Sequence, residues 1–264
     1  MKTLSNYINK IFNLENKVAV VIGGGGHLCG EMAQSLAKAK CNVAILDINL
    51  KKAKKVKKSI DDLKYKIKTA AIEIDVTKKS SHIRAYKKVL KYFKHIDILI
   101  NGAGINSPEP FFDITEKGWK SVIDSQVTGT FFACQIFGKY MVKRGKGSII
   151  NISSASANPP LSKAFAYSVS KSGIKNLTQN LAREWGTKGV RVNALRPGFF
   201  PTEWNKKNFI TKQREKAIIK HTPMSRFGKP SELTGAVLWL SSDSSSFVTG
   251  SEIFVDGGFS AMTI

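Results

Sequence analysis

Acidic side chains are scarce in this sequence. The 264 residues include 42 lysines and arginines but only 19 aspartates and glutamates, which gives a formal net charge of +23. Such a charge raises the question of a nucleic-acid partner. The densest lysine run spans residues 51–68, and apolar residues recur within it at helical spacing: Ala53, Val56, Ile60 and Leu63. The lysines are therefore expected to cover the solvent face of a packed helix. Since no nucleic-acid motif accompanies them, we expect no specific nucleic-acid partner, only steering of anionic ligands.

Cysteine is also scarce, and long hydrophobic runs are missing. Cys29, Cys41 and Cys134 are odd in number and widely spaced, which fits neither a disulfide framework nor a zinc site, so we expect reduced thiols and no bound metal. No apolar run approaches the ~20 residues that span a bilayer. The N-terminus carries Lys2 and Lys10 among its apolar residues, unlike a signal peptide. A cytoplasmic protein without a membrane partner is expected.

Short β-branched segments alternate with longer helical segments along the chain. We predict strands at residues 17–22, 42–46, 69–76, 96–100, 148–152, 190–194 and 252–255. Helices are predicted between them, including residues 80–93, a long helix over roughly 116–143, and one around Tyr167 that ends near 187. This alternation implies the α/β class, with a doubly wound (Rossmann) parallel sheet covered by helices on both faces. We expect an N-terminal extension over residues 1–16, a single catalytic domain over 17–264, and an irregular insert over 199–221.

A glycine run follows the first predicted strand and precedes a helix. It consists of Gly23, Gly24, Gly25 and Gly26, followed by His27 and Leu28. Glycines at this place permit a tight turn and a close backbone approach, and the helix N-terminus offers free N–H groups to a pyrophosphate. A glycine run alone is a weak signal, but its place after the first strand of an α/β chain predicts a dinucleotide site.

Asp47 ends the second predicted strand, 24 residues after Gly23. A carboxylate there can accept hydrogen bonds from the adenosine ribose and would repel a 2′-phosphate. Residues 48–50 supply no arginine for that phosphate, although residues 51 and 52 are lysines. This favours NAD over NADP. Capping of the lysine-rich helix by Asp47 is compatible with the cofactor role.

A tyrosine and a lysine stand at helical spacing in the second half of the chain. Tyr167 and Lys171 are four residues apart, and Ser154 is thirteen residues before the tyrosine. On a helix, positions i and i+4 share a face. A nearby cation lowers the phenol pKa from its ordinary value of roughly 10, and a serine hydroxyl can hold a substrate oxygen against the phenol. Such spacing is common on ordinary helices, so it gains weight from the predicted dinucleotide site.

With these features together, the chain resembles the short-chain dehydrogenase/reductase family over nearly its whole length. The resemblance implies that Ser154, Tyr167 and Lys171 are catalytic, that Tyr167 and Lys171 also contact the cofactor, and that the protein is a homotetramer or homodimer. It also implies further cofactor contacts from three short motifs and one nearby aromatic residue: Asp75, Val76, Asn101, Gly102, Ala103, Gly104, Pro197, Gly198, Thr202 and Phe200.

The sequence departs from the family pattern at four positions. His27 and Cys29 stand where the glycine loop of the family has further glycines, so the pyrophosphate is expected to meet residues 23–26. Gly102 stands where a second asparagine is usual. Gln126, seven residues after Trp119, replaces the fourth catalytic residue, an asparagine that kinks its helix and holds a water of the proton relay. It keeps the amide on a longer arm.

Three segments are similar to the branch of the family that contains fructuronate reductases and related sugar-acid dehydrogenases. They are residues 196–205, 222–228 and 255–262. A substrate carboxylate needs a basic partner, for which we consider Arg196, Lys163 and Lys206. Aromatic side chains are candidates for pocket walls: Phe111, Phe112, Phe199 and Phe200.

These features lead to the hypothesis of an NAD-dependent oxidoreductase that interconverts a carbonyl and a secondary alcohol. The expected substrate is small, polar and anionic, of the fructuronate, mannonate or gluconate type. A second hypothesis keeps the chemistry and changes the substrate to a 3-oxoacyl thioester, a ketosteroid or a cyclitol. A third, from another class, is a nicotinamide-binding sensor or scaffold; Gln126 and the altered glycine loop are its support.

Overall fold

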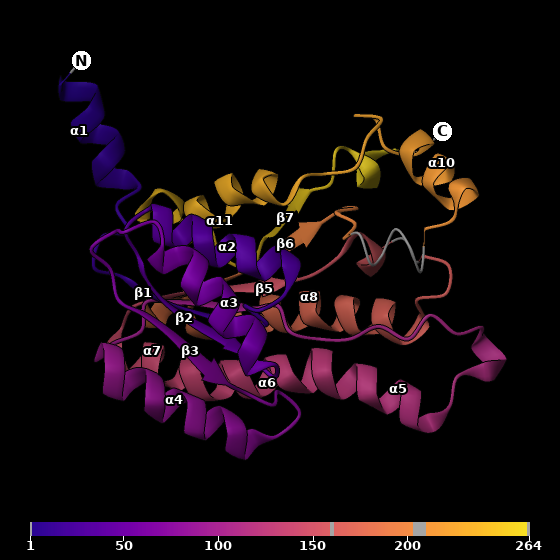
Figure 1. Cartoon of the computed structure of the whole chain (residues 1–264), viewed down its shortest axis with the longest axis horizontal. Coiled ribbons are helices and arrows are strands. Elements are labelled where there is room, and N and C mark those ends of the chain that lie inside the picture. Colours follow the sequence, from indigo (N-terminus) through magenta and orange to yellow (C-terminus); the bar gives the residue numbers. More distant parts are fainter. Residues whose placement is uncertain (1, 159–160, 203–209, 263–264) are drawn as a thin grey trace.

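The computed structural model describes residues 2–158, 161–202 and 210–262. Within them, seven parallel strands form one sheet in the order β3-β2-β1-β4-β5-β6-β7 (Figure 1). The strands are β1 (Val18–Ile22), β2 (Asn42–Asp47), β3 (Thr69–Glu73), β4 (Ile98–Asn101), β5 (Gly147–Ile152), β6 (Val190–Pro197) and β7 (Glu252–Val255). The central strands are buried on both faces, which explains their continuous apolar character.

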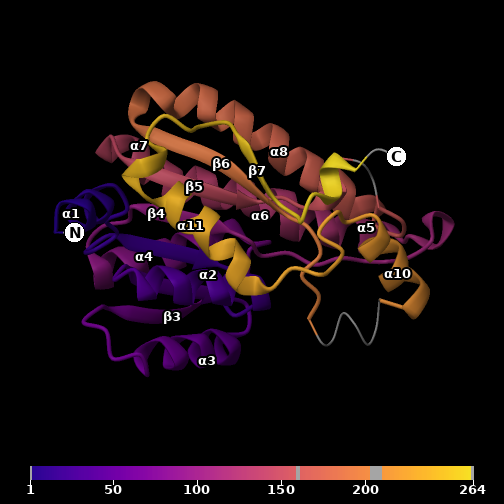
Figure 2. The same cartoon turned by 90° about the horizontal axis from the view of Figure 1, so that it is seen from above.

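Helices cover both faces of the sheet, as Figure 2 also shows. One face carries α2 (His27–Lys38), α3 (Leu50–Asp61) and α11 (Thr234–Ser241); the other carries α4 (Lys79–Phe93), α5 (Glu116–Ile123), α6 (Gly129–Ala133), α7 (Lys139–Arg144) and α8 (Phe165–Trp185). Two apolar cores result, one on each side of the sheet. The predicted doubly wound α/β fold is confirmed.

The lysine-rich helix α3 is amphipathic, as its sequence predicts. Ala53 and Ile60 are buried against the sheet, whereas Lys51, Lys54 and Lys58 are exposed. This arrangement confirms the interpretation of the lysine run as the solvated face of a packed helix.

The long helix predicted over residues 116–143 is present, and it contains two π-helical turns. These turns, Asp124–Thr128 and Cys134–Gly138, separate α5, α6 and α7. The sequence did not indicate these turns, because each inserts an extra residue without ending the run of helical backbone.

Two segments lie outside the layered body. Helix α1 (Lys2–Ile11) projects from one end of the molecule (Figure 1), whereas Leu14, shortly after it, is only 1% exposed and joins the core. The expected insert over residues 199–221 contains the helix α10 (Lys212–Lys220). None of the helices in the described residues is long and apolar enough to cross a membrane.

Candidate active site

The register of the sheet brings the predicted functional segments to one edge. Ile22 pairs with both Leu46 and Asn101, and Asn101 pairs in turn with Asn151. The strands therefore end at the same level, where the glycine loop, Asp47 and the segment after β5 begin. In a parallel sheet this carboxyl edge is where ligands bind.

The glycine loop is a close-fitting backbone turn. Gly23 has a φ of +80°, and a Cβ on it would lie 2.7 Å from the backbone nitrogen of Ala103. The N–H groups of Gly23 and Gly24 donate to the carbonyl of Leu46 (2.8 and 3.0 Å). Gly26 precedes α2, with His27 exposed at the first helical position and Leu28 packed on the core. The free N-terminal N–H groups of α2 therefore face the place expected for a pyrophosphate.

Asp47 is held beside this loop at the end of β2. Its carboxylate accepts hydrogen bonds from the N–H groups of Gly25 (3.0 Å) and Asn49 (2.9 Å). A Cβ on Gly25 would lie 2.9 Å from the same carboxylate, so glycine is needed for this approach. A backbone cradle next to an oriented carboxylate fits an adenine dinucleotide.

The next predicted cofactor residues lie around the ends of β3 and β4. Val76, Asn101 and Ala103 line one small pocket together with residues of α6. Asp75 is engaged locally, because its carboxylate accepts from the N–H and hydroxyl groups of Thr77 (3.1 and 2.7 Å) and pairs with Lys78 (3.0 Å).

Gly102 and Cys29, two departures from the family pattern, are in contact. A Cβ on Gly102 would lie only 2.2 Å from Sγ of Cys29. The thiol thus occupies the space that any larger residue at position 102 would need. Burial raises the pKa of the Cys29 thiol to about 12, which makes it an inert packing group. The three cysteines are buried and unpaired within the described residues.

The structure brings Ser154, Tyr167 and Lys171 together. Tyr167 and Lys171 project from one face of α8, with Nζ of Lys171 5.3 Å from the centre of the tyrosine ring. Nζ of Lys171 donates to the carbonyl of Ile152 (2.7 Å), and the side chain is only 4% exposed. Ser154, which follows β5, hydrogen-bonds the phenol of Tyr167.

The pKa values of these groups follow from burial. Burial raises the pKa of the Tyr167 phenol above its ordinary value, and the hydrogen bond from Ser154 only partly opposes this. Burial also lowers the pKa of Lys171 to about 8. The expected net lowering of the phenol pKa is therefore not found in this arrangement of residues, because burial outweighs the effect of the neighbouring cation. The phenol is protonated at neutral pH, which suits a group that gives a proton away.

Gln126 lies in the first π-helical turn and is 2% exposed. Its Nε2 donates to the carbonyl of Ile105 (3.0 Å), and its amide carbon fills the space beside Gly104, 2.2 Å from where a Cβ would stand. Its backbone carbonyl accepts the hydroxyl of Thr130 (2.7 Å). Among the described residues, its Oε1 has no hydrogen-bond partner. The side chain thus supports the loop after β4 and keeps one acceptor available.

Arg196 does not face a substrate. It is 2% exposed, and its Nη1 pairs with Oε2 of Glu252 (3.1 Å). Its Nη2 donates to the carbonyls of Ala155 (3.2 Å) and Asn158. The prediction that Arg196 binds a substrate carboxylate was wrong, because the guanidinium already has a buried carboxylate partner. Glu252 was missed, although its position on the neighbouring predicted strand could have indicated it.

The other predicted substrate cations differ in what the structure shows. Lys163 is exposed in the loop before α8, and Lys206 lies outside the described residues. Arg214 on α10, which the sequence reading missed, donates to the hydroxyl of Ser162 (3.1 Å). Two cationic side chains, Lys163 and Arg214, therefore occur close to the start of the helix that carries Tyr167.

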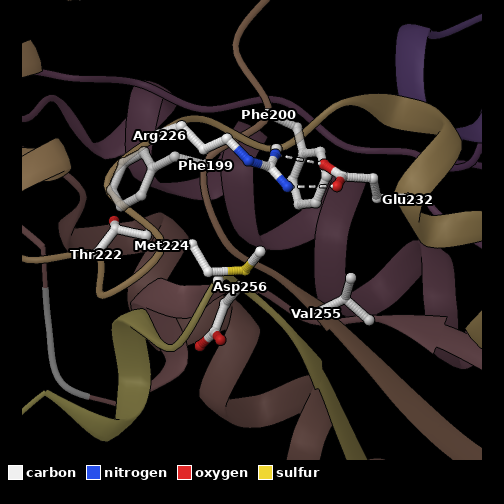
Figure 3. Close-up of a pocket in the computed structure, with 10 residues that line it drawn as sticks. Phe199, Phe200, Thr222, Met224, Arg226, Glu232, Val255 and Asp256 are labelled. Carbon is white, nitrogen blue, oxygen red and sulfur yellow. Dashed lines mark hydrogen bonds and ion pairs between the residues drawn. The ribbon is translucent and has the colours of Figure 1, made fainter.

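Aromatic residues line a pocket beside the Pro197–Gly198 turn (Figure 3). The lining residues are Phe199, Phe200, Thr222, Met224, Arg226, Gly228, Glu232, Val255, Asp256 and Gly257. Phe199 packs edge-to-face on Phe259, with ring centres 5.1 Å apart. Arg226 and Glu232 form a double hydrogen bond (2.8 and 2.7 Å) across the pocket rim.

Several predicted contact residues have packing roles here. Phe200 is 9% exposed, and its ring lies against Gly228 in the core, so the expected cofactor contact could come only from its backbone. The N–H of Gly198 donates to the carbonyl of Val255 (3.0 Å), which fixes the turn that leads to Thr202. Phe111 packs on Phe165 (5.2 Å), two residues before Tyr167, whereas Phe112 is almost fully exposed.

Comparison with known proteins decides the family. A family model described as enoyl-(acyl carrier protein) reductase, of the short-chain dehydrogenase/reductase type, matches residues 28–260. The chain belongs to the short-chain dehydrogenase/reductase family. Its sequence is 41% identical to an uncharacterized oxidoreductase, UxuB, of Bacillus subtilis, over 94% of this chain and 96% of that protein.

Solved structures of this family match the fold closely. A Haemophilus influenza protein provisionally named a D-mannonate oxidoreductase, with bound NAD, is 38% identical and has a TM-score of 0.87, over 95% of this chain and 97% of that one. A gluconate 5-dehydrogenase from Burkholderia cenocepacia, in complex with NADP and tartrate, is 29% identical and has a TM-score of 0.91, over 96% and 100% of the two chains. The protein is thus an oxidoreductase of this family, and the scaffold hypothesis is not retained.

Proposed function

We propose that the protein uses NAD to interconvert a carbonyl and a secondary alcohol on a small anionic substrate of the sugar-acid class. The observation that carries the proposal is the meeting of Ser154, the Tyr167 phenol and the Lys171 ammonium at the carboxyl edge of the sheet, next to a dinucleotide-type glycine loop.

The residues present divide the chemistry between them. The nicotinamide cofactor, when bound, supplies or accepts the hydride. Tyr167 is protonated at neutral pH and gives its phenolic proton to the carbonyl oxygen during reduction. Ser154 donates a hydrogen bond to that oxygen as negative charge develops on it. Lys171 keeps a positive charge below a pH of about 8 and stabilises the phenolate that remains.

The proton donor is tested by Tyr167→Phe. This variant should fold and bind NADH, which quenching of the protein's tryptophan fluorescence would show. Its turnover should fall roughly 10²- to 10⁴-fold because the proton donor is gone. Tyr86→Phe, on α4, is the matched control and should keep its activity. Near-normal turnover of Tyr167→Phe would refute the assignment.

NAD is the proposed cofactor because Asp47 presents a fixed carboxylate beside the glycine loop, which disfavours a 2′-phosphate. The NAD bound to the Haemophilus protein supports this choice, whereas the NADP bound to the Burkholderia enzyme shows that the family uses both. The ratio of kcat/KM for NADH over NADPH should be high and should fall in Asp47→Asn. A wild-type preference for NADPH would overturn the choice.

An anionic substrate is proposed because Lys163 and Arg214 occur near the Tyr167 helix and the protein carries a charge of +23. The names of the mannonate and gluconate relatives support it. In an absorbance screen of keto sugar acids, polyols and oxoacyl thioesters, Arg214→Gln should raise KM for the acids, whereas Arg183→Gln, at an exposed position late in α8, should not.

A neutral, more lipophilic ketone is the second candidate. The apolar side chains of Phe199, Phe200 and Met224 in the pocket of Figure 3 favour it. Activity confined to oxoacyl thioesters or steroid ketones in the same screen would replace the sugar-acid proposal with this one.

We also propose a homo-oligomer, because exposed aromatic side chains gather where Phe111, Phe112 and Phe165 adjoin. Light scattering after size-exclusion chromatography would test it, and a monomer at micromolar concentration would contradict it. The unpaired buried thiols fit a reducing compartment such as the cytoplasm.

A further inference from the structure

The chain segment that carries Ser154 is bonded to the sheet at its start, where the N–H of Ser153 donates to the carbonyl of Leu195 on β6 (2.8 Å), and side chains hold the rest of it. It leaves β5 at Ile152 and continues through a 3₁₀ turn, Ala155–Ala157. Lys171 binds the carbonyl of Ile152 (2.7 Å), and the hydroxyl of Ser172 binds that of Ala157 (2.6 Å). The remaining two carbonyls of this stretch that accept side chains, those of Ala155 and Asn158, share one donor, Nη2 of Arg196.

Glu252 holds Arg196 in place from the neighbouring strand. Its Oε2 pairs with Nη1 of Arg196 (3.1 Å), and its Oε1 accepts the hydroxyl of Ser153 (2.9 Å), the residue directly before Ser154. The two side chains are 2% and 10% exposed. The ring of Phe254 lies 4.7 Å from the guanidinium carbon and covers it.

We propose that Arg196 and Glu252 are positioning residues that hold the Ser154 hydroxyl against the Tyr167 phenol. The proposal rests on the catalytic roles proposed above for Ser154 and Tyr167. The pair binds the serine segment on both sides of Ser154. Glu252 accepts the hydroxyl of Ser153, and Arg196 donates to the carbonyls of Ala155 and Asn158.

Stability alone does not explain such a pair. A buried ion pair is generally no more stabilising than well-packed apolar side chains of similar volume, because the desolvation of two charges offsets their attraction. A planar guanidinium with two fixed partners does, however, restrict both the position and the orientation of what it binds. The Ser154 hydroxyl accepts a hydrogen bond from the N–H of Ser156 (3.2 Å), so its place depends on the course of the turn that Arg196 and Glu252 hold.

The double variant Arg196→Met/Glu252→Met separates positioning from stability. It removes both charges together and keeps the volume, but it leaves the Ser153 hydroxyl and the carbonyls of Ala155 and Asn158 without these partners, so it should fold with a modestly lowered thermal midpoint. NADH affinity should stay within about twofold, because the glycine loop and Asp47 are untouched. The kcat for the carbonyl substrate should fall roughly 10- to 100-fold, with a much smaller change in KM, because the serine is misplaced at the transition state.

Arg191→Met is the matched control. Arg191 lies at the other end of the same strand, is part-buried, and donates to the carbonyls of Leu240 (2.7 Å) and Val248 (3.1 Å). Its loss should lower the thermal midpoint and leave kcat within about twofold. Arg196→Lys is the conservative variant: its single ammonium can keep the ion pair with Glu252 but not both carbonyls in one plane, so it should stay folded and lose kcat.

Hydrogen exchange gives a readout that does not depend on turnover. Backbone amides of residues 153–158 should exchange faster in both Arg196 variants than in the wild type and in Arg191→Met. Unchanged exchange in this segment, or a double variant with wild-type kcat, would overturn the proposal. If the wild type reduces no compound in the screen while exchange rises as expected, the proposed function fails and the positioning of the segment stands.

Discussion

Lys171 is a cation in a place that water hardly reaches. Burial lowers its pKa to about 8, while burial raises the pKa of Tyr167 above its ordinary value. The lysine is therefore the first of the two to change its protonation state as the pH rises from neutral. Its loss of charge removes the electrostatic support of the phenolate that forms when the tyrosine gives up its proton.

We therefore expect kcat/KM for carbonyl reduction to stay level from about pH 6 and to fall as the pH rises through about 8. A pH series with saturating NADH would show it. The Lys171→Met variant should be slow at every pH and should lack this alkaline decline. A wild-type profile that stays flat to about pH 10 would contradict the role of Lys171.

The thiol of Cys29 leaves no room for a side chain at Gly102. Because a Cβ on Gly102 would lie 2.2 Å from the thiol, Gly102→Ala should destabilise the protein by roughly 1–3 kcal/mol through overpacking. In the Cys29→Ala background the same substitution should cost much less. Urea unfolding of the four proteins in this cycle measures the coupling, and additive effects would show that the two sites are independent.

At this scale the sequence revealed residues that meet at the carboxyl edge of the sheet, but not which side chains are buried. Ser154, Tyr167 and Lys171 were found from their spacing, and they do meet. Arg196 was assigned to the substrate because its charge is visible in the sequence, whereas its partner Glu252 is 56 residues away on β7. The small residue at position 102 makes room for the thiol of Cys29, which only tertiary packing reveals. In the sequence, the two residues appeared as unrelated departures from the family pattern.

Helices and strands were predicted from sequence patterns more accurately than the contacts of single residues. Each predicted strand exists, with ends that differ by a few residues, because period-2 and period-3.6 patterns reflect burial directly. The π-helical turn at Asp124–Thr128 was missed as secondary structure, although Gln126 was singled out within it. The helix α10 was missed because its sequence is mostly polar and Ile218 is its one buried residue.

The cap of α10 gives an element-scale prediction. The side chain of Thr211 accepts a hydrogen bond from the N–H of Arg214 (3.1 Å), so Thr211→Ala should destabilise the helix by about 1 kcal/mol. Amides of α10 should then exchange faster, while the global thermal midpoint changes little. KM for an anionic substrate should rise, because Arg214 is less well held.

Thr211→Ser is the control for this prediction, since it keeps the capping hydroxyl. It should behave like the wild type in exchange and in KM. Equal exchange of α10 in the alanine and serine variants would show that the cap contributes nothing.

The whole molecule is dominated by its positive charge. A net charge of +23 on one domain produces electrostatic repulsion within the folded protein. It also attracts anions at long range, and added salt screens both the repulsion and the attraction. The fold itself was predictable at this scale because alternating strands and helices allow few other architectures. The lysines of α3 face solvent, so they contribute to the positive electrostatic potential around the protein and not to its core.

Added salt should therefore have two opposite effects. The thermal midpoint should rise with KCl as repulsion is screened, whereas kcat/KM for an anionic substrate should fall roughly 3- to 10-fold between about 20 and about 300 mM. A neutral ketone serves as the control, and its kcat/KM should change little. Equal salt dependence for both substrates would rule out steering, and tight, salt-resistant binding of random DNA in a gel-shift assay would reopen the question of a nucleic-acid partner.

The contact between Phe199 and Phe259 has a practical consequence for anyone who handles this enzyme. It places the last described turn of the chain against the pocket of Figure 3, whereas the N-terminal helix α1 projects away from the layered body (Figure 1). Purification tags and attachment to a solid support therefore belong at the N-terminus. A tag fused to the C-terminus would lie close to the pocket of Figure 3.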